Sequence, residues 1–302
     1  MAEDVAVAAP AEAAPGAGGR SGAEPWIPEL SRGAVLWNGL RAYGLIVAMW
    51  TRSTMAYRAS FAMMAFGNFA ATAFDFVAIL MMFSHIESLG GFSLSEVAFL
   101  YGTAGTAFGL AELVLGSMNR LGGRVRDGTL DTLLVRPVPV LAQVAADKFA
   151  LRRLGRVLQG LLVLGYGLAT LDLDWTVARV LLLPTMIVSG AAIFCAVFVV
   201  GGAFQFWAQD ASEVQNAFTY GGNTLLQYPP SVFGRELVRG VTFVVPLAFA
   251  NWIPALYIMG REVPLGLPQE VAFLPPVVAA VCCALAGLVW RTGLRAYRST
   301  GS

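Results

Sequence analysis

Long apolar segments separated by short polar ones make up most of the chain after residue 58. Most of these segments carry no charged residue, and two of them carry one each, namely Asp75 and Glu112. A helix of about 20 apolar residues spans the hydrocarbon core of a bilayer. The pattern therefore predicts an all-α, polytopic membrane protein. Its six transmembrane helices are expected at about 59–83, 95–118, 152–171, 180–207, 237–260 and 271–290.

Two segments precede the first predicted span. Residues 1–33 are rich in Ala, Pro, Gly and Glu and show no apolar periodicity, which predicts a disordered cytoplasmic tail. Residues 34–58 are apolar but include Arg41, Arg52 and Arg58 among tryptophans and tyrosines. This mixture is typical of an interfacial amphipathic helix that lies in the headgroup plane. A first transmembrane span is the alternative for this segment.

The composition sharpens this picture, because 57% of the residues are hydrophobic and only 13% are charged. Soluble domains carry about 25% charged residues, so cytosolic enzymes, disordered scaffolds and secreted disulfide proteins are excluded. His85 is the only histidine and Lys148 the only lysine, and the chain has no GxxxxGK(S/T) phosphate loop. These absences disfavour zinc sites of the HExxH type, Ser-His-Asp triads and P-loop nucleotide sites. We expect neither an enzyme nor a metal or cofactor bound by this chain.

Basic residues are distributed unevenly between the two sides of the predicted membrane domain. With the N-terminus inside, 18 of the 20 basic residues fall in inside segments, and only Arg179 and Arg261 fall outside. Lysine and arginine are enriched in cytoplasmic loops of membrane proteins. The pattern therefore predicts that both the N- and the C-terminus are cytoplasmic.

The segment between the second and third predicted spans, 119–156, is the most distinctive stretch of the chain. Glycines interrupt it early and Pro137 and Pro139 interrupt it in the middle, and the short amphipathic sequence TLDTLLVR lies between them. A plain connector between two spans could be far shorter. Leucines next to arginines favour docking onto a partner. The alternative is a basic surface that lies on anionic lipid.

The order of these features resembles the ABC-2-type exporter permeases. The shared pattern is an amphipathic N-terminal helix, two spans, a basic loop that reads GTLDTLLVRP, and four more spans. Residues 128–149 and 228–260 carry most of the likeness, which covers roughly 35–295. The branch that the chain resembles pairs two dissimilar six-span permeases with one type of ATPase and includes viologen exporters. The resemblance implies a multi-pass protein of the bacterial cytoplasmic membrane.

In such families the loop after the second span forms a coupling helix that sits in a cleft of the ATPase subunit. The resemblance assigns this role to the loop 119–150. The residues concerned are Arg124, Arg126, Asp127, Leu130, Asp131, Leu133, Leu134 and Arg136. It also implies that two ATPase copies and a second permease chain, identical or different, complete the transporter. ATP with Mg²⁺ would be bound by the ATPase, and no nucleic acid is expected as a partner.

The resemblance leaves two placements for the fifth span. Many permeases of this type end that span at a Tyr-Pro or Phe-Pro pair and continue into a re-entrant hairpin. In this chain the pair is Tyr228-Pro229, which would place the span at 212–228. That stretch is too polar to be chosen by hydropathy, whereas 240–260 is apolar but contains two prolines, as a broken helix would. The prediction keeps the span at 237–260.

Asp75 and Glu112 lie inside predicted spans, where a carboxylate normally faces protein or water because its exposure to lipid is costly. Asn68 precedes Asp75 by seven residues and falls on the same helical face. These three side chains could form a polar lining for the path of a cationic or amphipathic substrate. The alternative is a structural role, in hydrogen bonds between helices or in pairing with an arginine.

The sequence as a whole favours the permease subunit of an ABC exporter. Such a subunit would move a hydrophobic, amphipathic or cationic substrate, such as a drug, lipid or metabolite, out of the cell with the help of a separate ATPase. Two other functions remain open: a proton-coupled secondary transporter that uses Asp75 or Glu112, and a non-transporting membrane assembly protein. The two halves of the chain show no inverted repeat, which disfavours the secondary transporter.

Overall fold

The computed structural model describes residues 32–208 and 211–297 as a set of helices, with no β-strand in these two ranges. The predicted tail lies almost entirely outside the described residues. The longer helices are α1 (Arg32–Met55), α2 (Arg58–Phe83), α3 (Leu94–Leu115), α7 (Leu154–Thr170), α8 (Val177–Phe204) and α13 (Pro275–Ala296). The shorter ones are α4 (Leu121–Arg126), α5 (Asp131–Leu134), α6 (Val140–Ala146), α9 (Ser212–Asn216), α10 (Gly222–Leu226), α11 (Arg235–Arg239) and α12 (Trp252–Ile258). The predicted all-α fold is confirmed.

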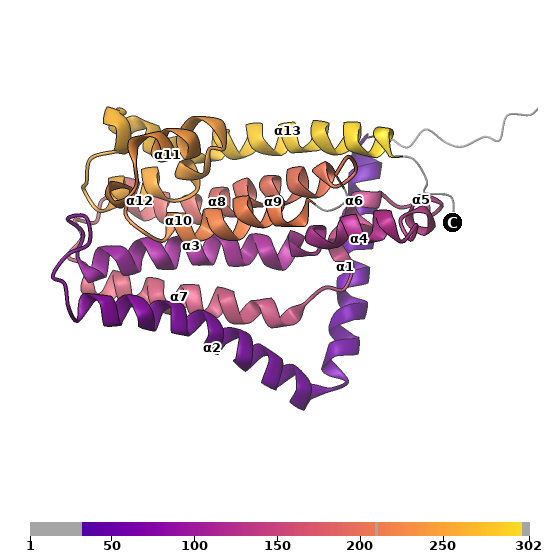
Figure 1. Ribbon diagram of the computed structural model, residues 1–302, viewed down its shortest axis with the longest axis horizontal. Coiled ribbons are helices and arrows are strands. Elements are labelled where there is room, and N and C mark those ends of the chain that lie inside the picture. The colour runs from indigo at the N-terminus through magenta and orange to yellow at the C-terminus, as the bar shows by residue number, and fades with distance from the viewer. Residues whose placement is uncertain (1–31, 209–210, 298–302) are drawn as a thin grey trace, which may run out of the picture.

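Successive passes of the chain run in opposite directions along a common bundle axis (Figure 1). The passes are formed by α2, α3, α7, α8, the α9–α10 segment and α13. Among the described residues, four helices are long and apolar enough to cross a membrane, namely α2, α3 with its continuation to Arg126, α8 and α13. α7 is shorter, with 17 residues. This is the architecture of a polytopic membrane protein.

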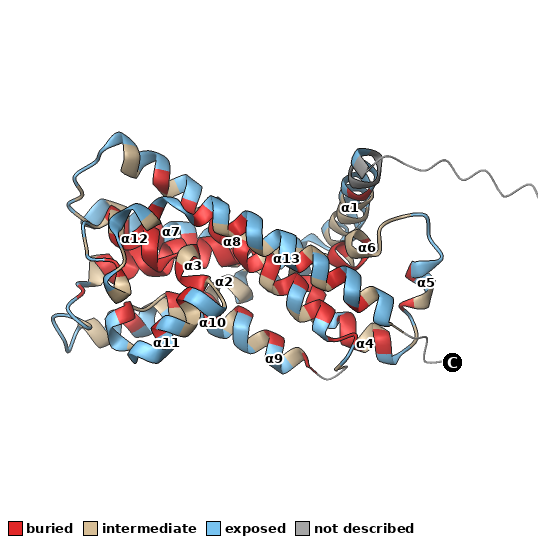
Figure 2. Ribbon diagram, turned by 90° about the horizontal axis from the view of Figure 1, so that it is seen from above, coloured by how far each residue is buried: buried red, intermediate tan, exposed pale blue. Residues whose placement is uncertain are grey.

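α3 lies in the interior of the bundle, whereas α2 lies at its edge. Nearly every side chain of α3 from Glu96 to Glu112 is buried, while α2 buries only Thr72 and Ile79, and the burial colours of Figure 2 concentrate in the middle of the bundle. Close backbone contact explains the burial of α3. A Cβ atom at Gly102 of α3 would lie 2.4 Å from the backbone nitrogen of Leu164 on α7. Small residues therefore let these two helices pack tightly, as they commonly do in membrane proteins.

α1 lies across one end of the bundle rather than along it (Figure 1). Tyr43 of α1 donates a hydrogen bond from its hydroxyl to the carbonyl oxygen of Val114 at 3.0 Å, which fixes the helix to the end of α3. The exposed face of α1 does not separate apolar from charged residues. Its larger exposed side chains include Trp37, Leu40, Arg41, Leu45, Met49 and Arg52. A mixed face of this kind suits the headgroup region, where arginines reach water and large apolar groups reach lipid.

The fifth pass differs from the predicted span at 237–260. A helix instead runs over Ser212–Leu226 and includes one π-helical turn. Three polar residues of this helix, Gln215, Thr219 and Asn223, are spaced four apart and are all buried. The helix therefore turns its polar face towards the protein. Hydropathy cannot identify such a pass, because the residues that lower its hydropathy are the ones that contact other helices.

Residues 235–258 form a helical hairpin at the end of the bundle away from α1 (Figure 1). The helix that begins with α11 ends where Val245 adopts an extended conformation (φ −118°, ψ 94°) in front of Pro246, which has no N–H to continue the helical hydrogen bonds. The chain then returns through α12. Arg235 and Arg239 consequently lie at this hairpin end of the bundle and not, as the predicted topology has them, on the side of α1.

Asn251 fixes the hairpin to the bundle. Its side-chain amide donates to the carbonyl oxygens of Leu100 and Leu226, both at 3.0 Å, and its Oδ1 accepts from the Thr103 hydroxyl at 2.6 Å. The next residue, Trp252, is fully buried, as is Asn251 itself. The buried amide of Asn251 is therefore fully paired, and its hydrogen bonds join the hairpin to α3 and to the end of the fifth pass.

Candidate functional site

Glu112 on α3 is the centre of a buried charge cluster. Its carboxylate oxygens lie 3.5 Å from Nε of Arg153 and 3.1 Å from Nε of Arg156, and one of them accepts a hydrogen bond from the Tyr220 hydroxyl at 2.9 Å. The contact with Arg156 is an ion pair without hydrogen-bond geometry. The Arg156 guanidinium also lies over the rings of Phe108 and Tyr220, at 5.3 and 5.6 Å. Glu112 is thus held by α7 and by the fifth pass together.

A polar cavity of about 200 Å³ lies next to this cluster, between α2, α3, α7 and the fifth pass. Its lining consists of Thr72, Asp75, Tyr101, Gly105, Arg156, Gln159, Tyr220, Asn223, Thr224 and Gln227. The Oδ1 atom of Asn223 is buried and has no hydrogen-bond partner among the described residues. A buried polar atom without a partner is costly, so this cavity favours a polar occupant, either water or a polar group of a ligand.

The structure separates the three residues predicted to line a substrate path. Asp75 lines the polar cavity, is exposed, and forms no hydrogen bond or ion pair with any other described residue. Glu112 does not line the cavity, but it forms an ion pair with Arg156, and Arg156 does line it. Asn68 lies outside the cavity, and its amide donates to the carbonyl oxygen of Arg152 at 3.2 Å. Of the three, Asp75 is the one that lines the cavity.

The segment 119–150 folds as α4, α5 and α6 at the same end of the bundle as α1 (Figure 1). Leu130 and Leu133 are buried inside the chain, so they do not lie on a surface that a partner could reach. The backbone around them is held by Gln143, whose amide donates to the carbonyl oxygens of Leu133 at 3.0 Å and Val138 at 2.9 Å. The resemblance assigned these two leucines to the coupling residues, whereas in the structure they belong to the buried core.

Two charged residues of the segment also hold it in place. Arg124 donates from Nε to the Asp147 carboxylate at 2.9 Å, and Asp131 accepts a hydrogen bond from the Tyr297 hydroxyl at 2.9 Å. The second contact ties the segment to the end of α13. Burial, together with this hydrogen bond, raises the pKa of Tyr297, so its hydroxyl stays protonated and able to donate at neutral pH. Arg124 and Asp131 therefore contribute to the fold of the segment.

The longest continuous exposed stretch of the segment is 134–137, called the tip below. Leu134 is 41% exposed and Val135 is 85% exposed, and Arg136 follows as an exposed cation. Arg126 and Asp127 add exposed charged side chains at the end of α4. The tip thus presents two apolar side chains and a cation on a loop whose backbone is held by hydrogen bonds from the buried Gln143 side chain.

A series of hydrogen-bonded side-chain amides, of which Gln205 and Gln215 are buried, joins the segment to the fifth pass. Gln205, at the end of α8, accepts from the backbone N–H of Gly122 and donates to the side chain of Gln215. Gln215 in turn donates to Asn119, whose amide donates to Asn216 at 3.2 Å. The start of the 119–150 segment and the start of the fifth pass are therefore connected through side chains that have little freedom to move separately.

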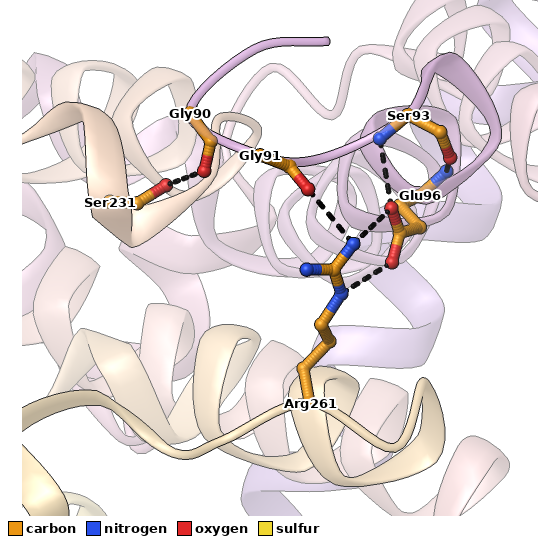
Figure 3. A network of polar contacts seen from close by, with 6 residues as sticks. All are labelled: Gly90, Gly91, Ser93, Glu96, Ser231 and Arg261. Carbon is orange, nitrogen blue, oxygen red and sulfur yellow. Dashed lines mark hydrogen bonds and ion pairs between the residues drawn. The ribbon is translucent and has the colours of Figure 1, made fainter.

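At the hairpin end, Arg261 clamps the loop between α2 and α3 (Figure 3). Its guanidinium donates to both carboxylate oxygens of Glu96, at 2.7 and 2.8 Å, and to the carbonyl oxygen of Gly91 at 2.9 Å. The hydrogen bonds with Glu96 raise the pKa of Arg261, so the clamp keeps its charge. Ser231, in front of the hairpin, adds a hydrogen bond to the carbonyl oxygen of Gly90 at 2.7 Å.

Sequence reasoning did not single out Arg156, Tyr220 or Asn251. A signal existed for Arg156, because a buried carboxylate needs a cation and Arg156 lies at the start of a predicted span. None existed for Tyr220, which lies in the polar stretch that hydropathy did not choose as a span. Asn251 lay in an apolar run, where an isolated amide indicates a hydrogen bond between helices but not its partners.

A family profile described as ABC-2 family transporter protein matches residues 69–301 of the chain. The match includes most of the bundle, the 119–150 segment and the hairpin. The comparison with curated proteins and the comparison with solved structures each gave no match. The profile covers far more than half of the chain and confirms the resemblance that the sequence suggested, so this chain belongs to the ABC-2 family of transporter proteins.

Proposed function

We propose that the chain is the permease subunit of an ABC exporter and that a separate ATPase drives it through the tip of the 119–150 segment. The proposal rests on the exposure of Leu134 and Val135 at the tip. The loop that carries them is held in place by hydrogen bonds from Gln143 and Tyr297. Apolar side chains presented on a fixed scaffold favour a protein partner. The family membership supports an ATPase as this partner.

The complete transporter in this proposal contains two ATPase copies and a second permease chain. ATP with Mg²⁺ is bound by the ATPase, because this chain lacks the P-loop sequence. The α1 end of the bundle and both termini face the cytoplasm. This orientation is supported by the basic residues of the 119–150 segment, since such residues are enriched in cytoplasmic loops.

The polar cavity is the proposed contact site for the substrate. Two charged residues line the cavity. Arg156 is paired with Glu112, whereas Asp75 forms no ion pair with any described residue. An unpaired carboxylate in this position favours a cationic or amphipathic substrate. The amide chain from Asn119 to Gln215 provides a route by which movement of the docked ATPase could reach the fifth pass, which lines the cavity.

Variants of the tip test the docking. Val135→Ser and Arg136→Glu, each in the full-length chain co-expressed with its ATPase, should reduce ATPase recovery in a pull-down and abolish transport, while membrane insertion stays normal. Leu237→Ser is a matched control, because Leu237 is 46% exposed at the opposite end of the bundle. Full ATPase binding and transport in both tip variants would show that the docking assignment is wrong and that the tip is a lipid-facing surface. The isolated wild-type chain should hydrolyse no ATP.

Cysteine labelling tests the orientation separately. Single cysteines at Ser88 and Asp172, in a chain whose natural cysteines have been replaced, should react with an impermeant thiol reagent added outside intact cells. A cysteine at Thr132, which is equally exposed in the structure but lies at the α1 end, should not react. Labelling of the Thr132 variant alone would reverse the proposed orientation.

A further inference from the structure

We infer that the chain binds one anionic phospholipid, with its phosphate held by Arg120, Lys148 and Arg152 and its acyl chains along the groove between α2 and α7. This site lies at the junction of α1 and α2, away from the polar cavity and the tip. It does not depend on the proposed docking of an ATPase. It requires only that the bundle lie in a membrane.

The headgroup part of the site is a pocket of about 260 Å³. Three of its lining residues, Arg120, Lys148 and Arg152, are cations from two separate parts of the chain, and its lining contains no carboxylate. None of the three side chains forms an ion pair within residues 32–208 and 211–297. All three residues are exposed, and three cations that line one pocket attract an anion. A phosphate diester supplies that anion and accepts several hydrogen bonds.

The backbone at Lys148 supports a functional reason for this arrangement. Lys148 has a φ of 48°, in the left-handed region that residues with a side chain rarely adopt. Such a conformation persists only where the surrounding structure enforces it, and it is concentrated at functional sites. Lys148, with this backbone conformation, lines the pocket together with the two arginines.

The remaining lining indicates a lipid rather than a soluble phosphate. The pocket is also lined by Trp50 of α1 and by Phe61 and Met64 of α2. Tryptophan and other aromatic side chains are typical of the zone where headgroups meet acyl chains. Soluble phosphate sites would not need this apolar surface next to the cations.

An apolar groove between α2 and α7 lies next to the pocket along α2. It has a volume of about 530 Å³ and is lined by residues such as Ala65 and Phe69 of α2 and Leu158 and Leu161 of α7. Met64, in the pocket, directly precedes Ala65, in the groove. A cationic pocket beside an apolar groove matches the polarity of a phospholipid, and basic pockets between membrane helices bind anionic headgroups.

Native mass spectrometry of the purified full-length chain in detergent tests the inference. The chain should retain one molecule of phosphatidylglycerol and bind phosphatidylcholine far more weakly. Each of the variants Arg120→Gln, Lys148→Gln and Arg152→Gln should lower the affinity for phosphatidylglycerol about fivefold, and the triple variant roughly a hundredfold. The variant Arg291→Gln/Arg295→Gln is the control, since it removes two exposed cations of α13 that are outside the pocket. It should bind phosphatidylglycerol as the wild type does.

Several outcomes would overturn the inference. Equal binding of phosphatidylglycerol and phosphatidylcholine by the wild-type chain would show that the pocket does not recognise negative charge. Unchanged phosphatidylglycerol binding in the three single variants would place the lipid elsewhere, and these variants keep the test valid if the triple variant does not fold. Displacement of the lipid by millimolar glycerol 3-phosphate would identify a soluble phosphate as the ligand. Filling the groove with Leu158→Trp should weaken lipid binding, and unaffected binding would exclude the groove as the acyl-chain site.

Discussion

Glu112 and Asp75 lie on neighbouring helices of the same bundle, and each is a single carboxylate in an apolar segment. The two carboxylates differ in their exposure and in their partners. The side chain of Glu112 is 9% exposed, contacts two arginines and accepts a hydrogen bond from Tyr220. Asp75 is exposed at a polar cavity and has no such partner among the described residues. The difference follows from the positions of their helices, because α3 is surrounded by other helices and α2 lies at the edge.

The comparison shows that a carboxylate can be buried and paired at one position of a bundle and exposed without an ion pair at another. A buried carboxylate requires cations and donors around it, and once these are present the cluster holds the helices in register. A carboxylate at the edge of the bundle contributes little to the fold and can be used for contact with a substrate. The 119–150 segment repeats the contrast, since Leu133 is buried and the adjacent Leu134 is exposed.

The largest effect is expected from Glu112→Gln. The substitution removes the negative charge between Arg153 and Arg156 and leaves two cations buried without a counter-charge, which costs about 3–5 kcal/mol in comparable pairs. The free energy of unfolding should fall by this amount, and the yield of monodisperse protein in detergent should drop. Thermal unfolding of the purified chain measures the loss. Adding Arg156→Gln should recover part of it, and a stable single variant would mean that the cluster does not hold the bundle.

A smaller effect is expected from Leu133→Ala. Leu133 is buried beneath the tip, so its truncation removes apolar burial and leaves a cavity, at a cost of about 2 kcal/mol or more. Leu134→Ala truncates a side chain that is 41% exposed and should change the free energy of unfolding by less than about 0.5 kcal/mol. Limited proteolysis of the 119–150 segment compares the two variants. Equal protease sensitivity would contradict the structural role of Leu133.

Tyr220→Phe should have a still smaller effect. It removes one hydrogen bond to the Glu112 carboxylate but keeps the ring, which packs edge-on against Phe108 at 5.1 Å between ring centroids. Hydrogen bonds between membrane helices contribute about 0.6 kcal/mol on average, so the thermal shift should be slight. A loss as large as that of Glu112→Gln would show that the hydroxyl, rather than the arginines, is the main partner of Glu112.

The sequence predicts the apolar passes of this fold well and its polar pass poorly. α2, α3, α8 and α13 are long apolar runs, and length and hydropathy are sufficient to find them. The fifth pass carries Gln215, Thr219 and Asn223 on its inner face, so its mean hydropathy falls although it lies within the bundle. The apolar stretch 237–260 bends back instead, because Pro246 interrupts its hydrogen bonds. Hydropathy registers how polar a segment is, but not which neighbour its polar face meets.

The candidate site shows the same limit at the level of single residues. The sequence identifies Asp75, Glu112 and the TLDTLLVR stretch as unusual. In the structure Asp75 lines the polar cavity, Glu112 is the centre of the charge cluster, and the stretch contains part of the tip. It does not identify which carboxylate is paired or which leucine is buried. Both properties depend on contacts between residues far apart in the chain, such as Glu112 with Tyr220, and a single sequence gives no information about those contacts.

The smallest effect on stability, and the sharpest test of the comparison, is expected from Asp75→Asn. Asp75 is exposed and makes no ion pair with the described residues, so its neutralisation should change the free energy of unfolding by less than about 0.5 kcal/mol. The same change removes the unpaired negative charge from the polar cavity. Transport of cationic substrates should therefore decrease, while transport of neutral ones and binding of the ATPase continue. Asp174→Asn, at an exposed residue outside the cavity, is the matched control. Transport assays with a panel of cationic and neutral compounds at matched expression decide the matter. An Asp75→Asn variant that unfolds like Glu112→Gln would show that Asp75 serves the fold, and one that transports cations normally would remove it from the substrate path.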